Sequence, residues 1–125
     1  MHSELRGNVA LVQISGRLER EEEAAIAREL LAHAAGLRAK GLLVDQRTLQ
    51  NRGRPSAVYH LTRDAAHRWH HIPVAILDLP ANREAAEFQE IAASNLGLEV
   101  RAFFAFDEAL AWVISRAEPT AESLL

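Results

Sequence analysis

Four short apolar runs, separated by longer segments of helical period, constrain the fold of this chain more than any other feature. The runs cover residues 9–16, 42–47, 72–79 and 98–104. Each has the length of a strand, and the first alternates apolar with polar side chains near its end. The run "LLVDQR" at 42–47 is apolar on successive residues, which is typical of a strand buried on both faces.

The segments between and after these runs have the features of helices. The predicted helices lie within 19–41, 55–70, 82–97 and 107–117. Gly36 or Gly41 is expected to end the first helix. Pro55 suits the first position of the second, because the N–H that proline lacks has no helical partner there. Asn82 and Gly97 suit the N-cap and the C′ position of the third.

Strands that alternate with helices predict a single α/β domain, over residues 1–118, whose sheet is largely parallel and has helices packed on it. Turn-forming residues at 6–8 precede the first run, so residues 3–5 are expected to form a short hairpin strand. Residues 119–125 are expected to form a flexible C-terminal tail.

Charge and composition exclude several classes of partner. The chain has 125 residues, a formal net charge of −3 and no cysteine. A negative net charge argues against nucleic acid as a partner. No apolar run approaches the roughly 18 residues that a membrane-spanning helix needs, so we expect no stable membrane insertion. The N-terminal stretch lacks the apolar core of a secretory signal, and we therefore expect a cytoplasmic protein.

Four of the six histidines fall within residues 60–71, in and just after the second predicted helix. One face of that helix carries His60, Asp64, His67 and His71, nearly opposite a face that carries Val58, Leu61, Ala65 and Trp69. Imidazole and carboxylate are ligands that zinc or nickel accepts. Pro73 disfavours helix where His71 would have to bind, and no other element supplies a further ligand. We therefore expect a solvated or dimer-facing surface, and these four residues remain only weak candidates for binding a metal.

A basic loop follows the second run. It contains Arg47, Arg52 and Arg54, and Ser56 stands at the start of the helix that follows. Ligands of open parallel sheets bind outside the carboxyl ends of the strands, and helix N-termini attract anions. These residues are therefore candidates for an anion, phosphoryl-ligand or partner site. The alternative is a solvated arginine loop that balances the glutamate-rich segment before it.

Enzyme motifs are absent from the sequence. There is no G-x-S-x-G, Walker loop, G-x-G-x-x-G or H-E-x-x-H motif, so we expect no cofactor and favour a non-enzymatic role. Asp45 and Asp78 each come near the end of a predicted strand, where an enzyme could use them with a histidine. A structural role in capping loop backbone is the preferred interpretation for both.

The aromatic residues allow two interpretations. They include Phe88, Phe103, Phe104, Phe106, Trp69 and Trp112. Aromatic side chains in strands and helices usually form core, which is the interpretation we favour. The alternative is that they line a pocket between helices and sheet for an apolar or lipid-like ligand.

Three stretches resemble SpoIIAA-like proteins of the STAS/SEC14-like group, over about residues 3–116. They are "VQISGRLEREE", "IPVAILDLP" and "VRAFFAFDEALAWV". The resemblance implies a mostly parallel sheet of four or five strands with one antiparallel edge strand, covered by about four helices. It also implies a regulatory or binding role. STAS antagonists are switched by phosphorylation of a serine at a helix start, where Ser56 stands, although their aspartate-serine-serine-glycine-like motif is absent here.

The leading hypothesis is a non-enzymatic SpoIIAA/STAS-like module that binds a protein partner or a small anionic ligand beside the loop 47–56. Phosphorylation of Ser56 or Thr48 would place a dianion among arginines, which would hold it. Pairing of two copies through an uncovered edge strand or the histidine-rich helix is a further expectation.

Overall fold

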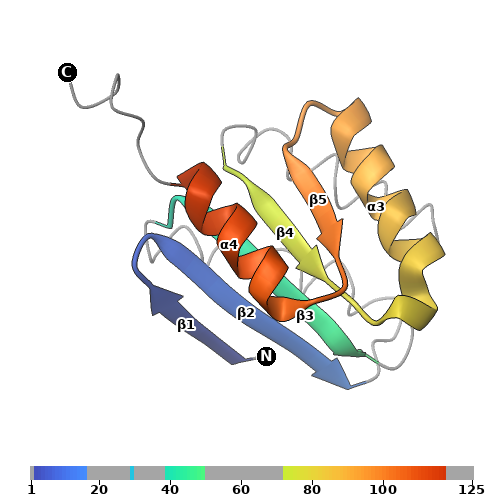
Figure 1. The fold of residues 1–125 in the computed structure, drawn as a ribbon, viewed down its shortest axis with the longest axis horizontal. Coiled ribbons are helices and arrows are strands. Elements are labelled where there is room, and N and C mark those ends of the chain that lie inside the picture. The colour runs from blue at the N-terminus through green and yellow to red at the C-terminus, as the bar shows by residue number, and fades with distance from the viewer. Residues whose placement is uncertain (1, 17–28, 30–38, 50–71, 118–125) are drawn as a thin grey trace.

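A computed structural model of the chain describes residues 2–16, 29, 39–49 and 72–117 (Figure 1). The strands are β1 (His2–Arg6), β2 (Val9–Gly16), β3 (Gly41–Leu49), β4 (Val74–Leu77) and β5 (Val100–Phe103). The helices are a 3₁₀ turn at Pro80–Asn82, α3 (Arg83–Asn95) and α4 (Phe106–Ala117). The described residues therefore confirm an α/β fold.

The five strands form one mixed sheet in the order β1-β2-β3-β4-β5. β1 pairs with β2 in antiparallel orientation, and the other three pairs are parallel. This confirms the mostly parallel sheet and the antiparallel edge strand. The hairpin between β1 and β2 turns at Gly7, whose φ of 61° is in the left-handed region that glycine adopts without strain.

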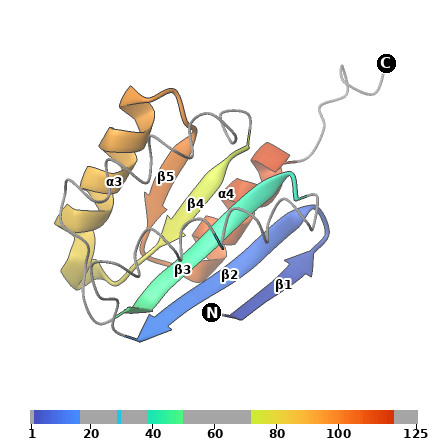
Figure 2. The same ribbon diagram turned by 180° about the vertical axis from the view of Figure 1, so that it is seen from behind.

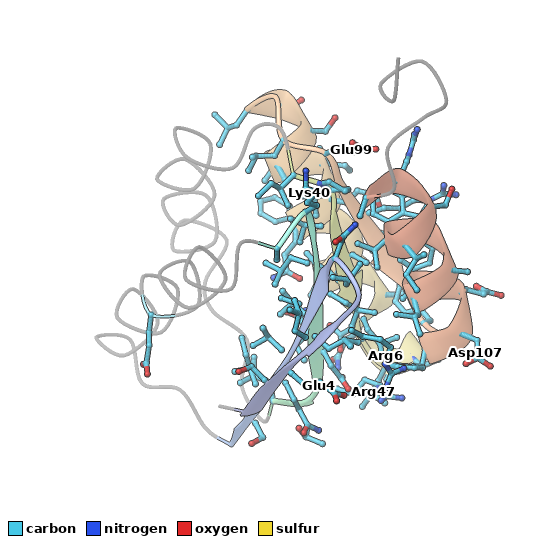
Figure 3. The ribbon with its side chains drawn as sticks, turned by 90° about the vertical axis from the view of Figure 1, so that its left-hand side faces the viewer. Glu4, Arg6, Lys40, Arg47, Glu99 and Asp107 are labelled. Carbon is cyan, nitrogen blue, oxygen red and sulfur yellow. The ribbon has the colours of Figure 1, made fainter. Side chains whose placement is uncertain are left out.

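The two sides of the sheet have separate apolar cores, because successive side chains of a strand point to opposite faces. The α4-side core comprises Val9, Leu11, Leu43, Ala75, Leu77, Ala109, Val113 and Ala117. The α3-side core comprises Ala10, Val12, Ala39, Leu42, Val44, Ile72, Ala93 and Leu98. α4 crosses one face of the sheet and α3 lies beside β5 (Figures 1 and 2). Seen edge-on, α4 runs along one side of the strands (Figure 3).

Gly41 sets how closely α4 approaches the sheet. A Cβ at this position would lie 3.0 Å from Ala117 Cβ and 3.0 Å from Val113 Cγ2. Gly41 is the first residue of β3, so its place there reflects the close contact with α4, and the predicted role at a helix end is wrong for it.

The ends of α3 confirm one predicted cap and modify the other. Gly97 follows the C-cap residue with φ of 82°. Asn82 occupies the N-cap, but its side chain makes no capping bond there and donates through Nδ2 to Asp78 Oδ1 at 3.2 Å. The amide therefore joins the helix start to the end of β4.

The described residues contain two α-helices, where the sequence predicts about four. The segments predicted for the other two, within 19–41 and over 55–70, lie almost entirely outside the described residues, as does the predicted tail 119–125. In the described part of the chain, no helix is long and apolar enough to cross a membrane. The expected cytoplasmic location stays a prediction.

Candidate functional site

The carboxyl ends of the parallel strands form the edge where the sequence predicts a binding site, and β3 ends there with a bulge. Gln13 pairs with Asp45, whereas two residues later Ser15 pairs with Thr48, so β3 carries one extra residue. Residues that are paired side by side share a face of the sheet. Asp45 and Thr48 therefore lie on the α4 side, although their spacing would put them on opposite faces of a regular strand.

Arg47, within the bulge, is held by Asp45. Its Nε and Nη2 donate to Asp45 Oδ1 and Oδ2 at 3.0 and 2.9 Å, and its backbone N–H donates to Oδ1 at 3.0 Å. The hydrogen bonds and charge of Asp45 raise the pKa of the Arg47 guanidinium against the smaller opposing effect of burial. The Asp45 side chain is 13% exposed and that of Arg47 40%, so the pair is anchored in the sheet and reaches the surface.

Asp78, at the end of β4, is fully buried and serves as an acceptor for the surrounding chain. Its Oδ1 accepts from the Leu79 backbone N–H at 2.8 Å and from Asn82, and its Oδ2 accepts from Gln46 Nε2 at 2.9 Å. Gln46 Nε2 also donates to Gln89 Oε1, on α3, at 2.8 Å. We call Gln46, Asp78, Asn82 and Gln89 the polar lock, because they join β3, β4 and α3.

The two carboxylates do not converge. Asp45 pairs with Leu77, and Asp78 is the next residue, so the alternation of side chains places Asp45 on the α4 side and Asp78 with Gln46 on the α3 side. Each accepts a hydrogen bond from a backbone N–H one or two residues further on. This confirms the preferred loop-capping interpretation and gives no support to an enzyme that uses both.

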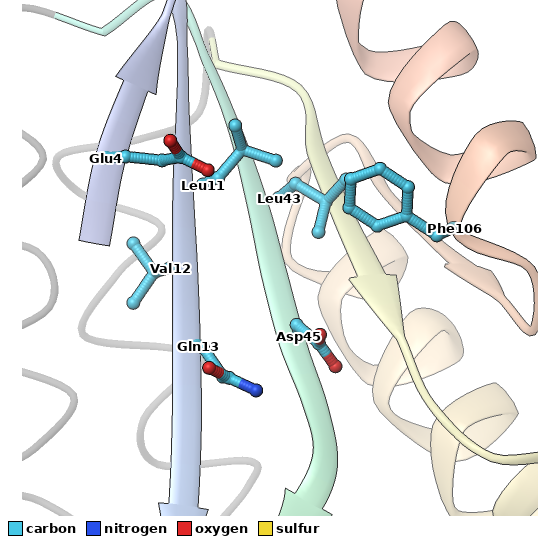
Figure 4. Close-up of a pocket in the computed structure, with 7 residues that line it drawn as sticks. All are labelled: Glu4, Leu11, Val12, Gln13, Leu43, Asp45 and Phe106. Atoms are coloured by element: carbon cyan, nitrogen blue, oxygen red, sulfur yellow. The ribbon is translucent and has the colours of Figure 1, made fainter. Parts of the chain in front are cut away.

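A shallow hollow of about 140 Å³ opens on the α4 side, between the first three strands and the start of α4. Figure 4 shows its lining: Glu4, Leu11, Val12, Gln13, Leu43, Asp45 and Phe106. Pockets for drug-sized ligands usually enclose about 300–1,000 Å³. The hollow is smaller than that, and two carboxylates line it, so it does not favour an apolar or lipid-like ligand. That function stays a prediction.

The sequence-predicted site residues fall into two groups. Arg47 and Thr48 are exposed at the end of β3, and Thr48 Oγ1 donates to the Ile14 carbonyl at 3.4 Å. Arg52, Arg54 and Ser56 lie outside the described residues. So do the histidine-face residues His60, Asp64, His67 and His71. Among the residues that the structure describes, no group of three or more metal-ligating side chains occurs.

Two predictions about this edge need correction or extension. The loop predicted directly after the run 42–47 starts later, because Thr48 and Leu49 continue β3 and pair with Ser15 and Gly16. The polar lock was not predicted from sequence. Its one signal is Gln46, a polar residue that directly follows an apolar run, and that signal is common at strand ends.

Two comparisons with known proteins identify no relative. No model of a known protein family matches the chain, and a search of curated proteins finds no match. The resemblance to SpoIIAA-like proteins therefore depends on the sequence stretches alone.

Proposed function

We propose that the chain is a non-enzymatic binding module of SpoIIAA/STAS-like type that docks a protein partner at the carboxyl edge of its sheet. The docking surface would begin at Arg47 and Thr48 and extend along the sequence to Arg52, Arg54 and Ser56. The mixed five-stranded sheet and its antiparallel edge strand agree with what the resemblance implies.

The observation that carries this proposal is that the polar side chains at this edge hold the protein's own chain. Asp78 accepts from Gln46, Leu79 and Asn82, and both oxygens of Asp45 are engaged by Arg47. The donors that the structure describes on these two carboxylates are backbone N–H, amide and guanidinium groups, and none of these is the nucleophile that catalysis pairs with a general base. Within the described residues of β3, those that this edge exposes to a partner are Arg47 and Thr48.

A protein partner fits this surface better than a small free anion does. The guanidinium fork of Arg47, which would bind a carboxylate or phosphate, already holds Asp45. The hollow beside it is lined by two carboxylates, Glu4 and Asp45, and none of the lining residues that the structure describes is basic, so the hollow offers an anion no positive charge of its own. A protein can contact the edge over a larger area and does not need that fork.

Site-specific photo-crosslinking tests the proposal. A photoreactive amino acid at Thr48 is expected to cross-link a discrete partner in extract of the source cell. The same group at Ser115, an exposed residue of α4, is the matched control and is expected not to do so. Arg47→Gln should reduce the yield of cross-linked partner from the probe at Thr48, and the variant is expected to stay folded. Equal cross-linking of the same proteins from both positions, or a yield that Arg47→Gln leaves unchanged, would refute the proposed surface.

Phosphorylation of the docking surface is the regulatory part of the proposal. Thr48 is exposed, and a phosphate on its hydroxyl would add a dianion next to Arg47. Ser56→Asp and Thr48→Asp are expected to change the cross-linked amount relative to the alanine variants. If the aspartate and alanine variants capture equal amounts of partner, the phosphorylation switch is excluded. That result does not bear on the docking surface, which the cross-linking at Thr48 tests separately.

A further inference from the structure

The two edges of the sheet differ in how they are covered. At the β5 edge, the outward-pointing backbone N–H of Ala102 donates to Glu90 Oε2 of α3 at 3.1 Å. At the opposite edge, β1 presents Leu5, whose exposed fraction is 48%. Figure 3 faces this edge, with β1 nearest the viewer. Uncovered edge strands pair readily with other strands, and proteins usually limit this pairing with charged side chains or by covering the edge with a helix or loop.

The hairpin geometry determines which backbone groups of β1 point outward. The turn has two residues, so Arg6 and Val9 form its closing hydrogen-bonded pair, and the next pair, Leu5 with Ala10, is not hydrogen-bonded. The Asn8 carbonyl accepts from Lys40 N at 2.7 Å, which shows that the even-numbered groups of β2 face β3. The N–H and C=O of Leu5 therefore point away from the sheet.

The charges on β1 are complementary to those of a second copy in one particular register. Glu4 and Arg6 lie on the same face, with Arg6 Nη2 3.5 Å from Glu4 Oε1, and both are about half exposed. In an antiparallel pair centred on Leu5, each Glu4 lies opposite the other copy's Arg6. A register centred on Glu4 would place the two glutamates against each other, which is unfavourable.

We propose that two copies of this chain pair through their β1 strands, antiparallel and centred on Leu5, to form a continuous ten-stranded sheet. The two Leu5 residues exchange backbone hydrogen bonds at the two-fold axis, and their side chains meet on one face. On the other face, the four charges of Glu4 and Arg6 alternate in sign. The contact is short, so the dimer is expected to be weak and concentration-dependent.

Charge variants test both the pairing and its register. Glu4→Arg leaves two arginines on β1 and Arg6→Glu leaves two glutamates, so each variant faces its own copy with like charges. Two cross-strand contacts become repulsive, and we expect each variant to weaken dimerisation roughly ten- to thirtyfold. A mixture of the two variants should form heterodimers, since every arginine then faces a glutamate. The double variant Glu4→Arg/Arg6→Glu should dimerise like the wild type.

Sedimentation equilibrium of the full chain over a concentration series gives the association constants. Glu87→Arg is the matched control, because it makes the same charge change and breaks an exposed Arg83–Glu87 pair of 3.5 Å on α3, away from β1. Circular dichroism checks that each variant is folded. The wild-type association should also weaken as salt is added.

Three results would overturn the proposal. The first is a wild type that stays monomeric at every concentration. The second is a dimer that Glu87→Arg weakens as much as Glu4→Arg does, which would indicate a nonspecific effect of charge. The third is a mixture of the two single variants that associates no better than either alone, which would exclude the register centred on Leu5.

Discussion

Replacement of Gln46 by leucine is expected to destabilise the protein although leucine is apolar and of similar size. Gln46 is 6% exposed and donates from Nε2 to Asp78 Oδ2 at 2.9 Å and to Gln89 Oε1 at 2.8 Å. Leucine fills the same space but donates nothing. The buried carboxylate of Asp78 then loses one of its donors.

The size of the effect follows from these two bonds. A hydrogen bond to a charged group contributes about 1.5–3 kcal/mol and one to a neutral group about 1 kcal/mol. Burial of the apolar leucine side chain stabilises the folded protein by about 1–1.5 kcal/mol and offsets part of this loss. We therefore expect the free energy of unfolding to fall by about 2 kcal/mol. With a typical denaturant slope for a small domain, this lowers the urea midpoint by about 1 M.

Urea unfolding followed by far-ultraviolet circular dichroism measures this change. Gln89→Leu is the matched control, because Gln89 is half buried and its loss leaves the bond between Gln46 and Asp78 in place. It should cost no more than about 1 kcal/mol. A Gln46→Leu protein as stable as the wild type would show that the polar lock contributes nothing net, and the structural role assigned to Asp78 would be wrong.

Three further changes have defined outcomes. Gly41→Ala should lower the free energy of unfolding by about 1–3 kcal/mol in a denaturant titration, because its Cβ would lie 3.0 Å from Ala117 Cβ and Val113 Cγ2. An unchanged free energy of unfolding would mean that α4 moves away freely. Val113→Ala should lower the free energy of unfolding by about 2 kcal/mol in the same assay. Because the shorter side chain leaves room beside residue 41, Gly41→Ala should destabilise the Val113→Ala protein less than it destabilises the wild type. Asp45→Asn should lower the free energy of unfolding by about 1 kcal/mol, a small effect because Arg47 is partly exposed. The stability difference from the wild type should shrink in high salt, and a difference independent of salt would argue against an ionic cause.

Hydrophobic pattern was sufficient to predict most strands of the sheet, but not their order in it. The runs that became β2, β3 and β4 are apolar because both faces of these strands contribute to the cores, whereas β5 at the sheet edge is only partly buried. The turn before residue 9 predicts the hairpin. Gly97 marks the end of α3 because its φ of 82° suits glycine. Phe103, Phe106 and Trp112 pack against the α4-side core, which confirms the core interpretation for them, whereas Phe88 is exposed.

Local pattern was insufficient where long-range register decides the outcome. The sequence places Asp45 and Asp78 at similar strand ends, but their faces depend on which residue of β3 pairs with which of β4. The local sequence does not predict the bulge in β3 either, because the bulge is defined by pairing with β2 and not by any residue type. Gln46 finds its partners 32 and 43 residues away, which no local spacing reveals.

The end of β3 combines these long-range effects in three consecutive residues. Gln46 points to the α3 side and joins the polar lock, whereas Arg47 turns back to Asp45 and Thr48 lies on the α4 side at the surface. Stability and binding at this edge should therefore be separable. Changes at Gln46 should lower the free energy of unfolding, while changes at Thr48 should alter partner capture with the unfolding midpoint nearly constant. If Thr48→Ala instead destabilises the protein as much as Gln46→Leu does, the bulge serves the fold alone and the case for a docking surface at this edge loses its structural basis.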